Sequence, residues 1–85
     1  MTLEEIYVTY EELKKEGYKK ESLFCATCKM FINDELSIDD LKSALKVLGY
    51  KLSDELLKMD KEQQKALIND YIIGFAEEYD LKEFK

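Results

Sequence analysis

The sequence predicts an all-α fold, a single small domain of four to five helices spanning residues 1–85. Five segments carry apolar residues at the spacing of about 3.6 residues that is typical of one side of a helix. Glycine or a small polar residue stands at most of the boundaries between them. The 85 residues, 46% of them apolar, suffice for one hydrophobic core but not for two.

The first helix is expected from Leu3 to Glu16. Thr2 and Glu5 have the spacing of a capping box, in which the threonine hydroxyl accepts an early backbone N–H while the glutamate reaches back. Residues 6–10 are rich in strand formers, but an isolated strand would find no partner elsewhere in the chain. The apolar residues at helical spacing are Leu3, Ile6, Tyr7, Tyr10 and Leu13, and a left-handed stop is expected at Gly17.

The second helix, expected from Lys20 to Asn33, is apolar around almost its whole circumference. Its apolar residues are Leu23, Phe24, Cys25, Ala26, Cys28, Met30, Phe31 and Ile32. A helix of this kind is either buried on most sides or lines a groove.

Two shorter helices are expected next. Ser37 caps a helix over residues 38–48, and Gly49 ends it. Ser53 starts a short segment that continues through Met59.

The last and longest helix is expected from Lys61 to Tyr79, with Asp60 and Gln63 at the spacing of a capping box. One face of this helix carries Leu67, Ile68, Tyr71, Ile72, Phe75 and Tyr79. Ile73 and Ala66 fall on the opposite side, where they form either a second apolar surface or isolated exposed residues.

Residues 13–19 and 45–51 have five identical positions in seven, including the pair Gly-Tyr. Both segments read as a helix end, a glycine stop and the start of the next helix. Duplication of a helix–turn–helix unit and chance similarity both explain this match.

The charge balance limits the classes of function. All 13 cations are lysine, 19 residues are acidic, and the net charge is −6. Such a chain repels phosphate backbones, so nucleic-acid binding is not expected. The absence of histidine removes the most frequent general base and metal ligand. Catalysis is therefore not expected, nor is a cofactor. No apolar run is long enough to span a membrane, and without a signal peptide a cytoplasmic location is expected.

Cys25 and Cys28 lie three residues apart on one side of the second helix, close enough to form a disulfide or to hold one metal ion. No other cysteine or histidine completes a zinc site, and no strand precedes the helix as in redox proteins. Inside an apolar run, free cysteine behaves as a small buried residue. We expect core packing, with a redox role as the alternative.

Four acidic pairs stand at positions 34–35, 39–40, 54–55 and 77–78. Three of them lie near predicted helix starts, where negative charge is stabilised by the helix dipole. Nothing in the sequence indicates the cleft or the raised pKa that paired catalytic carboxylates need.

Residues 34–55, from Asp34-Glu35-Leu36-Ser37 through Leu48-Gly49-Tyr50-Lys51-Leu52-Ser53-Asp54-Glu55, resemble the calmodulin and myosin-light-chain family. In that family the end of a calcium loop runs into a helix with this leucine and glycine pattern, followed by a capped acidic helix start. The resemblance implies EF-hand-like helix pairs that form a lobe and grip a partner helix, and an irregular helical bundle is the alternative architecture.

The calcium loops themselves depart from the family pattern. In the first candidate loop, Lys29 occupies position one and Phe31 position three, where oxygen ligands are needed. A second loop starting at Asp60 puts Lys65 at the glycine position and Tyr71 at position twelve. The resemblance therefore implies a calcium-free lobe, and no metal binding is expected.

Two functional hypotheses follow. The first is a non-enzymatic protein-binding module, calcium-independent, whose apolar groove between the second and last helices receives a partner protein, such as an amphipathic helix. Its candidate partner-binding residues are Met30, Phe31, Leu57, Met59, Ile73 and Phe75, each of which core packing also explains. The second is an acidic inhibitor or nucleic-acid mimic of the mobile-element type that occupies a basic site on a target enzyme. Homo-oligomerisation is compatible with both.

Overall fold

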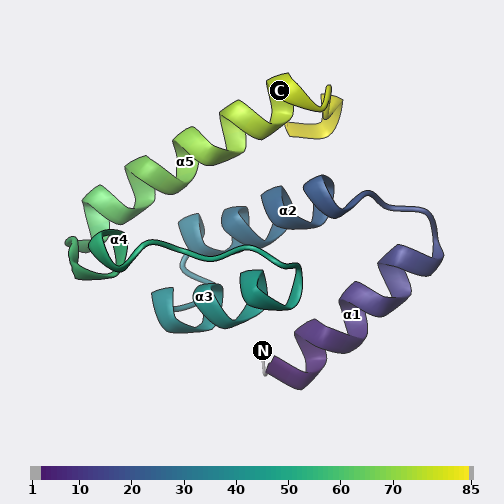
Figure 1. The fold of residues 1–85 in the computed structure, drawn as a ribbon, viewed down its shortest axis with the longest axis horizontal. Helices are drawn as coiled ribbons and strands as arrows, with labels where there is room; N and C mark the ends of the chain where they lie inside the picture. Colours follow the sequence, from purple (N-terminus) through teal and green to yellow (C-terminus); the bar gives the residue numbers. More distant parts are fainter. Residues whose placement is uncertain (1–2, 85) are drawn as a thin grey trace.

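The computed structural model describes residues 3–84, and over this range the chain is all-α, as the sequence predicts. Five α-helices and a final 3₁₀ turn follow one another without a strand in the described residues. They are α1 (Leu3–Lys15), α2 (Lys20–Ile32), α3 (Ile38–Val47), α4 (Asp54–Lys58), α5 (Lys61–Glu78) and η1 (Lys82–Phe84). Figure 1 shows α2 in the middle of the molecule, with α5 along one side and α3 along the other.

The helix starts are fixed by local hydrogen bonds at the predicted caps. The Ser37 hydroxyl accepts the backbone N–H of Asp40 at 3.1 Å, and Ser53 accepts that of Leu56 at 3.2 Å. The Asp60 carboxylate accepts the N–H of Gln63 at 2.9 Å. The predicted cap at Thr2 lies outside the described residues, as do the side chains of Leu3 and Ile6. Each predicted helix is present, and its ends agree with the prediction to within one residue.

Four helices end in a residue with left-handed backbone. Gly17 and Gly49 have φ of 94° and 89°, which confirms both predicted glycine stops. Asp34 and Asp80 adopt the same conformation after α2 and α5, with φ of 63° and 53°, and were not predicted as stops. At each stop the following N–H donates to the carbonyl five residues earlier: Tyr18 to Leu13, Glu35 to Met30, Tyr50 to Leu45, and Leu81 to Ala76. This hydrogen bond is typical of the Schellman motif.

Helix α2 is the centre of the core. Its buried residues are Ser22, Leu23, Phe24, Cys25, Thr27, Cys28 and Phe31. Those of α3 are Leu41, Ala44 and Leu45, and those of α5 are Gln64, Ile68, Ile72 and Ala76. Helix α2 is therefore buried on most sides, as one of the two interpretations of an apolar helix expects.

Helices α2 and α5 lie side by side in opposite directions (Figure 1). The turn after α2 approaches the start of α5, while the start of α2 approaches the end of α5. There the Ser22 hydroxyl donates to the carboxylate of Glu83 at 3.1 Å, which fastens the η1 turn to α2. This antiparallel pair therefore has two distinct ends.

Helix α1 is attached through a buried hydroxyl pair. The Thr27 hydroxyl donates to the carbonyl of Leu23 at 2.7 Å, so the Tyr10 hydroxyl must donate to the Thr27 oxygen. Burial raises the pKa of Tyr10, and this hydrogen bond opposes the shift. Tyr7 and Val8 on the other side of α1 remain exposed. No helix in residues 3–84 is long and apolar enough to cross a membrane.

Candidate functional site

The two thiols of α2 are core residues, as predicted. Cys25 and Cys28 are both unpaired and fully buried. Burial raises the pKa of the Cys25 thiol to about 11, and the carboxylate of Glu83 adds to this shift. Burial raises the pKa of Cys28 still further. Because the thiolate is the reactive form, thiols this strongly protonated at neutral pH are poor nucleophiles and poor metal ligands.

The two candidate calcium loops are largely helical. Residues 29–32 of the first form the last turn of α2, and residues 38–40 form the first turn of α3. Beyond Asp60, the second lies entirely within α5. Among the described residues, no group of three or more cysteine and carboxylate side chains is arranged to hold a metal ion.

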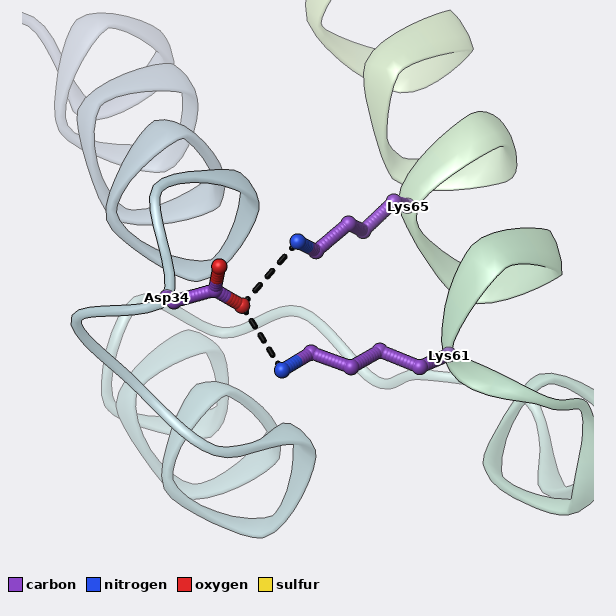
Figure 2. Close-up of polar contacts among 3 residues, drawn as sticks. All are labelled: Asp34, Lys61 and Lys65. Atoms are coloured by element: carbon purple, nitrogen blue, oxygen red, sulfur yellow. Dashed lines mark ion pairs between the residues drawn. The ribbon is translucent and has the colours of Figure 1, made fainter.

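One end of the α2–α5 pair is closed by ion pairs (Figure 2). A single carboxylate oxygen of Asp34 lies 2.7 Å from the Lys61 ammonium and 3.0 Å from that of Lys65. Hydrogen bonds from the two lysines lower the pKa of Asp34. The aspartate ends α2 with left-handed backbone and pairs with α5 at the same time. We therefore assign these three residues a structural role, and we call them the Asp34 clamp.

The other end carries a cluster of aromatic rings from three segments. Phe24 of α2 lies 4.3 Å from Phe75 of α5 and 4.7 Å from Tyr50, measured between ring centroids. Tyr79 contacts Phe75 edge-on at 5.4 Å. Phe24 is buried, whereas Tyr50 and Phe75 are only half-buried and Tyr79 is exposed. The cluster therefore has a core member and a rim that faces solvent.

Two neighbouring hollows open at this rim. The smaller, of about 200 Å³, is lined by Phe24, Tyr50, Lys51, Leu52, Tyr71 and Phe75. The larger, of about 490 Å³, is lined by Lys42, Lys46, Gly49, Tyr50, Lys51 and Leu52. Residues 50–52 line both hollows, so the two hollows adjoin, and together we call them the Tyr50 groove. The lining residues of the smaller hollow belong to α2, α5 and the segment between α3 and α4.

A further lysine stands over the ring at the centre of the groove. The Lys20 ammonium lies 4.6 Å from the centroid of Tyr50, a distance at which a cation and an aromatic face attract each other. Burial raises the pKa of Tyr50, with Glu21 the next contributor. The groove is thus apolar on the α2–α5 side and basic on the α3 side.

Of the six residues predicted to bind a partner, only Phe75 lines the Tyr50 groove. Phe31 is a core residue, 2% exposed, and Met30 is half-buried beside it. Leu57 and Met59 belong to α4 and its C-terminal cap, and Met59 is 36% exposed. Ile73 faces outward from α5, 47% exposed, beside a hollow of about 420 Å³ that includes Phe84. The structure does not bring the six together on one surface.

Most of the residues that line the groove were not predicted as site residues. These are Phe24, Lys42, Lys46, Gly49, Tyr50, Lys51, Leu52 and Tyr71. The sequence does indicate the basic part of the groove, because Lys42 and Lys46 are four residues apart and therefore share one side of α3. The glycine stop then places Tyr50 and Lys51 directly after that side. The contribution of α5 to the groove depends on tertiary packing.

Comparisons with known proteins identify no relative. A scan against protein-family models, a search of curated proteins and a search of solved structures each find no match.

Proposed function

We propose that this chain is a non-catalytic protein-binding module that works without calcium and holds a segment of its partner in the Tyr50 groove. The observation that carries the proposal is the pair of adjoining hollows that share Tyr50, Lys51 and Leu52. Half-exposed aromatic side chains are typical anchors at protein interfaces, because they supply a large contact area at low entropic cost.

The apolar hollow beside Phe24 and Tyr71 measures about 200 Å³, which suits a single side chain of a partner and is less than the roughly 300–1,000 Å³ of pockets that enclose a drug-sized ligand. The adjoining hollow, of about 490 Å³, reaches that range, so the proposal of a partner protein depends on the half-exposed aromatic side chains rather than on volume. The resemblance of residues 34–55 to lobes that grip amphipathic helices supports the same proposal, since this segment contains Tyr50 and Leu52. The protonated state of both thiols supports a non-catalytic role.

The experiment is a selection of random-sequence peptides against the folded protein, followed by titration of the selected peptides into variants. Tyr71→Ala removes a half-buried groove side chain, and Phe75→Leu removes a ring while keeping apolar volume. We expect each to weaken binding about tenfold or more, as for interface anchors. Tyr18→Ala is the matched control, because Tyr18 follows the other glycine stop and is 53% exposed.

The melting temperature of each variant, followed by circular dichroism, separates loss of binding from loss of fold. Failure to select any saturably binding peptide would contradict the proposal. So would peptides whose affinity is unchanged by both groove substitutions.

A second candidate function, the acidic inhibitor or nucleic-acid mimic, is favoured by the outer face of α5. Its exposed residues include Glu62, Asp70, Glu77 and Glu78, and its one exposed lysine, Lys61, pairs with Asp34. Four charges over roughly 24 Å of helix are sparser than the one per 3.4 Å of a single DNA strand. We therefore rank this function second. Binding that disappears when Asp70, Glu77 and Glu78 are replaced by lysine would favour it over the groove.

A further inference from the structure

The basic half of the Tyr50 groove indicates what kind of partner segment fits it. Lys42, Lys46 and Lys51 line the larger hollow, and none of its lining residues is acidic. Lys20 adds a fourth ammonium group above the Tyr50 ring. This concentration of positive charge runs against the net charge of −6 of the whole chain.

These lysines differ from the two that form ion pairs with Asp34. Within residues 3–84, Lys42, Lys46 and Lys51 form no ion pair, whereas Lys61 and Lys65 both contact the Asp34 carboxylate. Lys46 gains from its place in the last turn of α3, where the helix dipole favours a cation. The positions of Lys42 and Lys51 have no such explanation, and like charges four residues apart on a helix repel each other.

We infer that the segment that occupies the Tyr50 groove is an acidic peptide of a partner protein, with carboxylates beside bulky apolar side chains. This inference rests on the proposed function. The apolar side chains pack against Phe24, Tyr71 and Phe75, and the carboxylates face Lys42, Lys46 and Lys51. A short peptide is favoured over a nucleic acid because a long polyanion would also meet the repulsion of the acidic chain as a whole.

The test uses the peptides selected from the random library and two triple variants of the full chain. Lys42→Gln, Lys46→Gln and Lys51→Gln together remove the charges that line the groove. Lys14→Gln, Lys15→Gln and Lys29→Gln together change the net charge equally, at exposed positions outside both hollows. Each peptide is also synthesised with asparagine for aspartate and glutamine for glutamate.

We expect the selected peptides to be enriched in acidic and apolar residues. The groove variant should bind them about tenfold more weakly than the wild type, since exposed ion pairs contribute modestly and there are three of them. The control variant should bind as the wild type does. The difference should disappear when the ionic strength rises from about 0.01 M to about 1 M, because the Debye length falls from about 30 Å to about 3 Å.

The outcomes separate this inference from the proposed function. Peptides that need Tyr71 and Phe75 but are neutral or basic, or that bind the groove variant normally, overturn the acidic partner and leave the binding module intact. Failure to select any peptide overturns both. Saturable binding of single-stranded oligothymidylate that requires the groove lysines, or dimerisation of the free chain that requires them, would assign the groove to a different occupant and overturn the inference.

Discussion

Both ends of the antiparallel α2–α5 pair carry lysines, which within residues 3–84 form ion pairs at one end and none at the other. At one end Lys61 and Lys65 share the one carboxylate of Asp34 within 3.0 Å, in ion pairs that are largely exposed to solvent. At the other end Lys42, Lys46 and Lys51 line a hollow together with half-buried Tyr50, and no carboxylate is among the lining residues of either hollow. Lysine content alone therefore does not distinguish lysines that pair within the fold from lysines that form no ion pair. What distinguishes the groove is positive charge that the fold leaves unbalanced beside apolar surface.

The largest effect on stability is expected at the core of the groove end. Phe24 is 4% exposed and contacts both Tyr50 and Phe75. Phe24→Ala should lower the free energy of unfolding by about 3–5 kcal/mol, because it leaves a cavity between α2 and α5. Urea denaturation measures this loss. A decrease below about 1 kcal/mol would mean that the aromatic cluster does not close around Phe24.

Polar substitutions in the middle of α2, between the two ends, should lower the free energy of unfolding. Replacing Cys25 and Cys28 by serine should cost roughly 1–3 kcal/mol, since a buried hydroxyl without a partner pays its full desolvation. Cys28→Ser should cost more than Cys25→Ser, because a small shift between α2 and α5 would bring a hydroxyl at position 25 within reach of the Ile72 carbonyl, which the Cys25 sulfur approaches at 3.9 Å. The alanine variants provide the controls. Equal losses for both serines would contradict this assignment of partners.

Substitutions at the two glycine stops should cause a loss of stability of intermediate size, and the two positions can be compared directly. Gly17→Ala and Gly49→Ala should each cost about 1–2 kcal/mol, because an L-residue is strained in left-handed backbone. The two losses should be similar, since a Cβ added at Gly49 would make only ordinary contact with the Lys20 ammonium, at 3.4 Å, and one added at Gly17 would lie in open space. Of the two, only Gly49→Ala should also weaken peptide binding. Thermal melts and peptide titrations of both variants check this contrast.

The smallest effect is expected at the Asp34 clamp, because its ion pairs are exposed to solvent. The lowered pKa of folded Asp34 means that its stabilisation is complete above the unfolded value of about 3.9 and disappears as the pH falls through the folded pKa. Asp34→Asn, whose side chain also tolerates left-handed backbone, removes only the charge.

The stability difference between wild type and Asp34→Asn should therefore be present at neutral pH and vanish in acid. Denaturant titrations at several pH values measure it. A difference that persists below the folded pKa of Asp34 would show that backbone preference, rather than charge, explains the effect.

Local signals made the helices predictable. Ser37, Ser53 and Asp60 accept the N–H three residues ahead, as their spacing predicts. Gly17 and Gly49 adopt the predicted left-handed backbone. Asp34 was not predicted as a stop. Its side chain pairs with two lysines that lie 27 and 31 residues further along the chain, and the sequence around Asp34 contains no sign of this pairing.

The groove was less predictable for the same physical reason. Tyr18 and Tyr50 follow nearly identical sequences and make the same backbone hydrogen bond after a glycine. Tyr18 is exposed, whereas Tyr50 packs against Phe24 and Phe75. The identity of these neighbours depends on how α2 and α5 pack, which the helical periodicity of each segment alone does not specify. Phe75 was predicted because it lies on the apolar face of α5, and it is the one of the six predicted residues that lines the groove.

We propose that the Tyr50 end of the α2–α5 pair binds a segment of a partner protein, whereas the Asp34 end only stabilises the fold. The most direct measurement is an amide chemical-shift titration of the folded chain with the tightest of the selected peptides. We expect saturable shifts around Phe24, residues 50–52, Tyr71 and Phe75, and none around the Asp34 clamp. Shifts centred on Asp34, on Ile73 at the outer face of α5, or on Tyr7 and Val8 of α1 would contradict it.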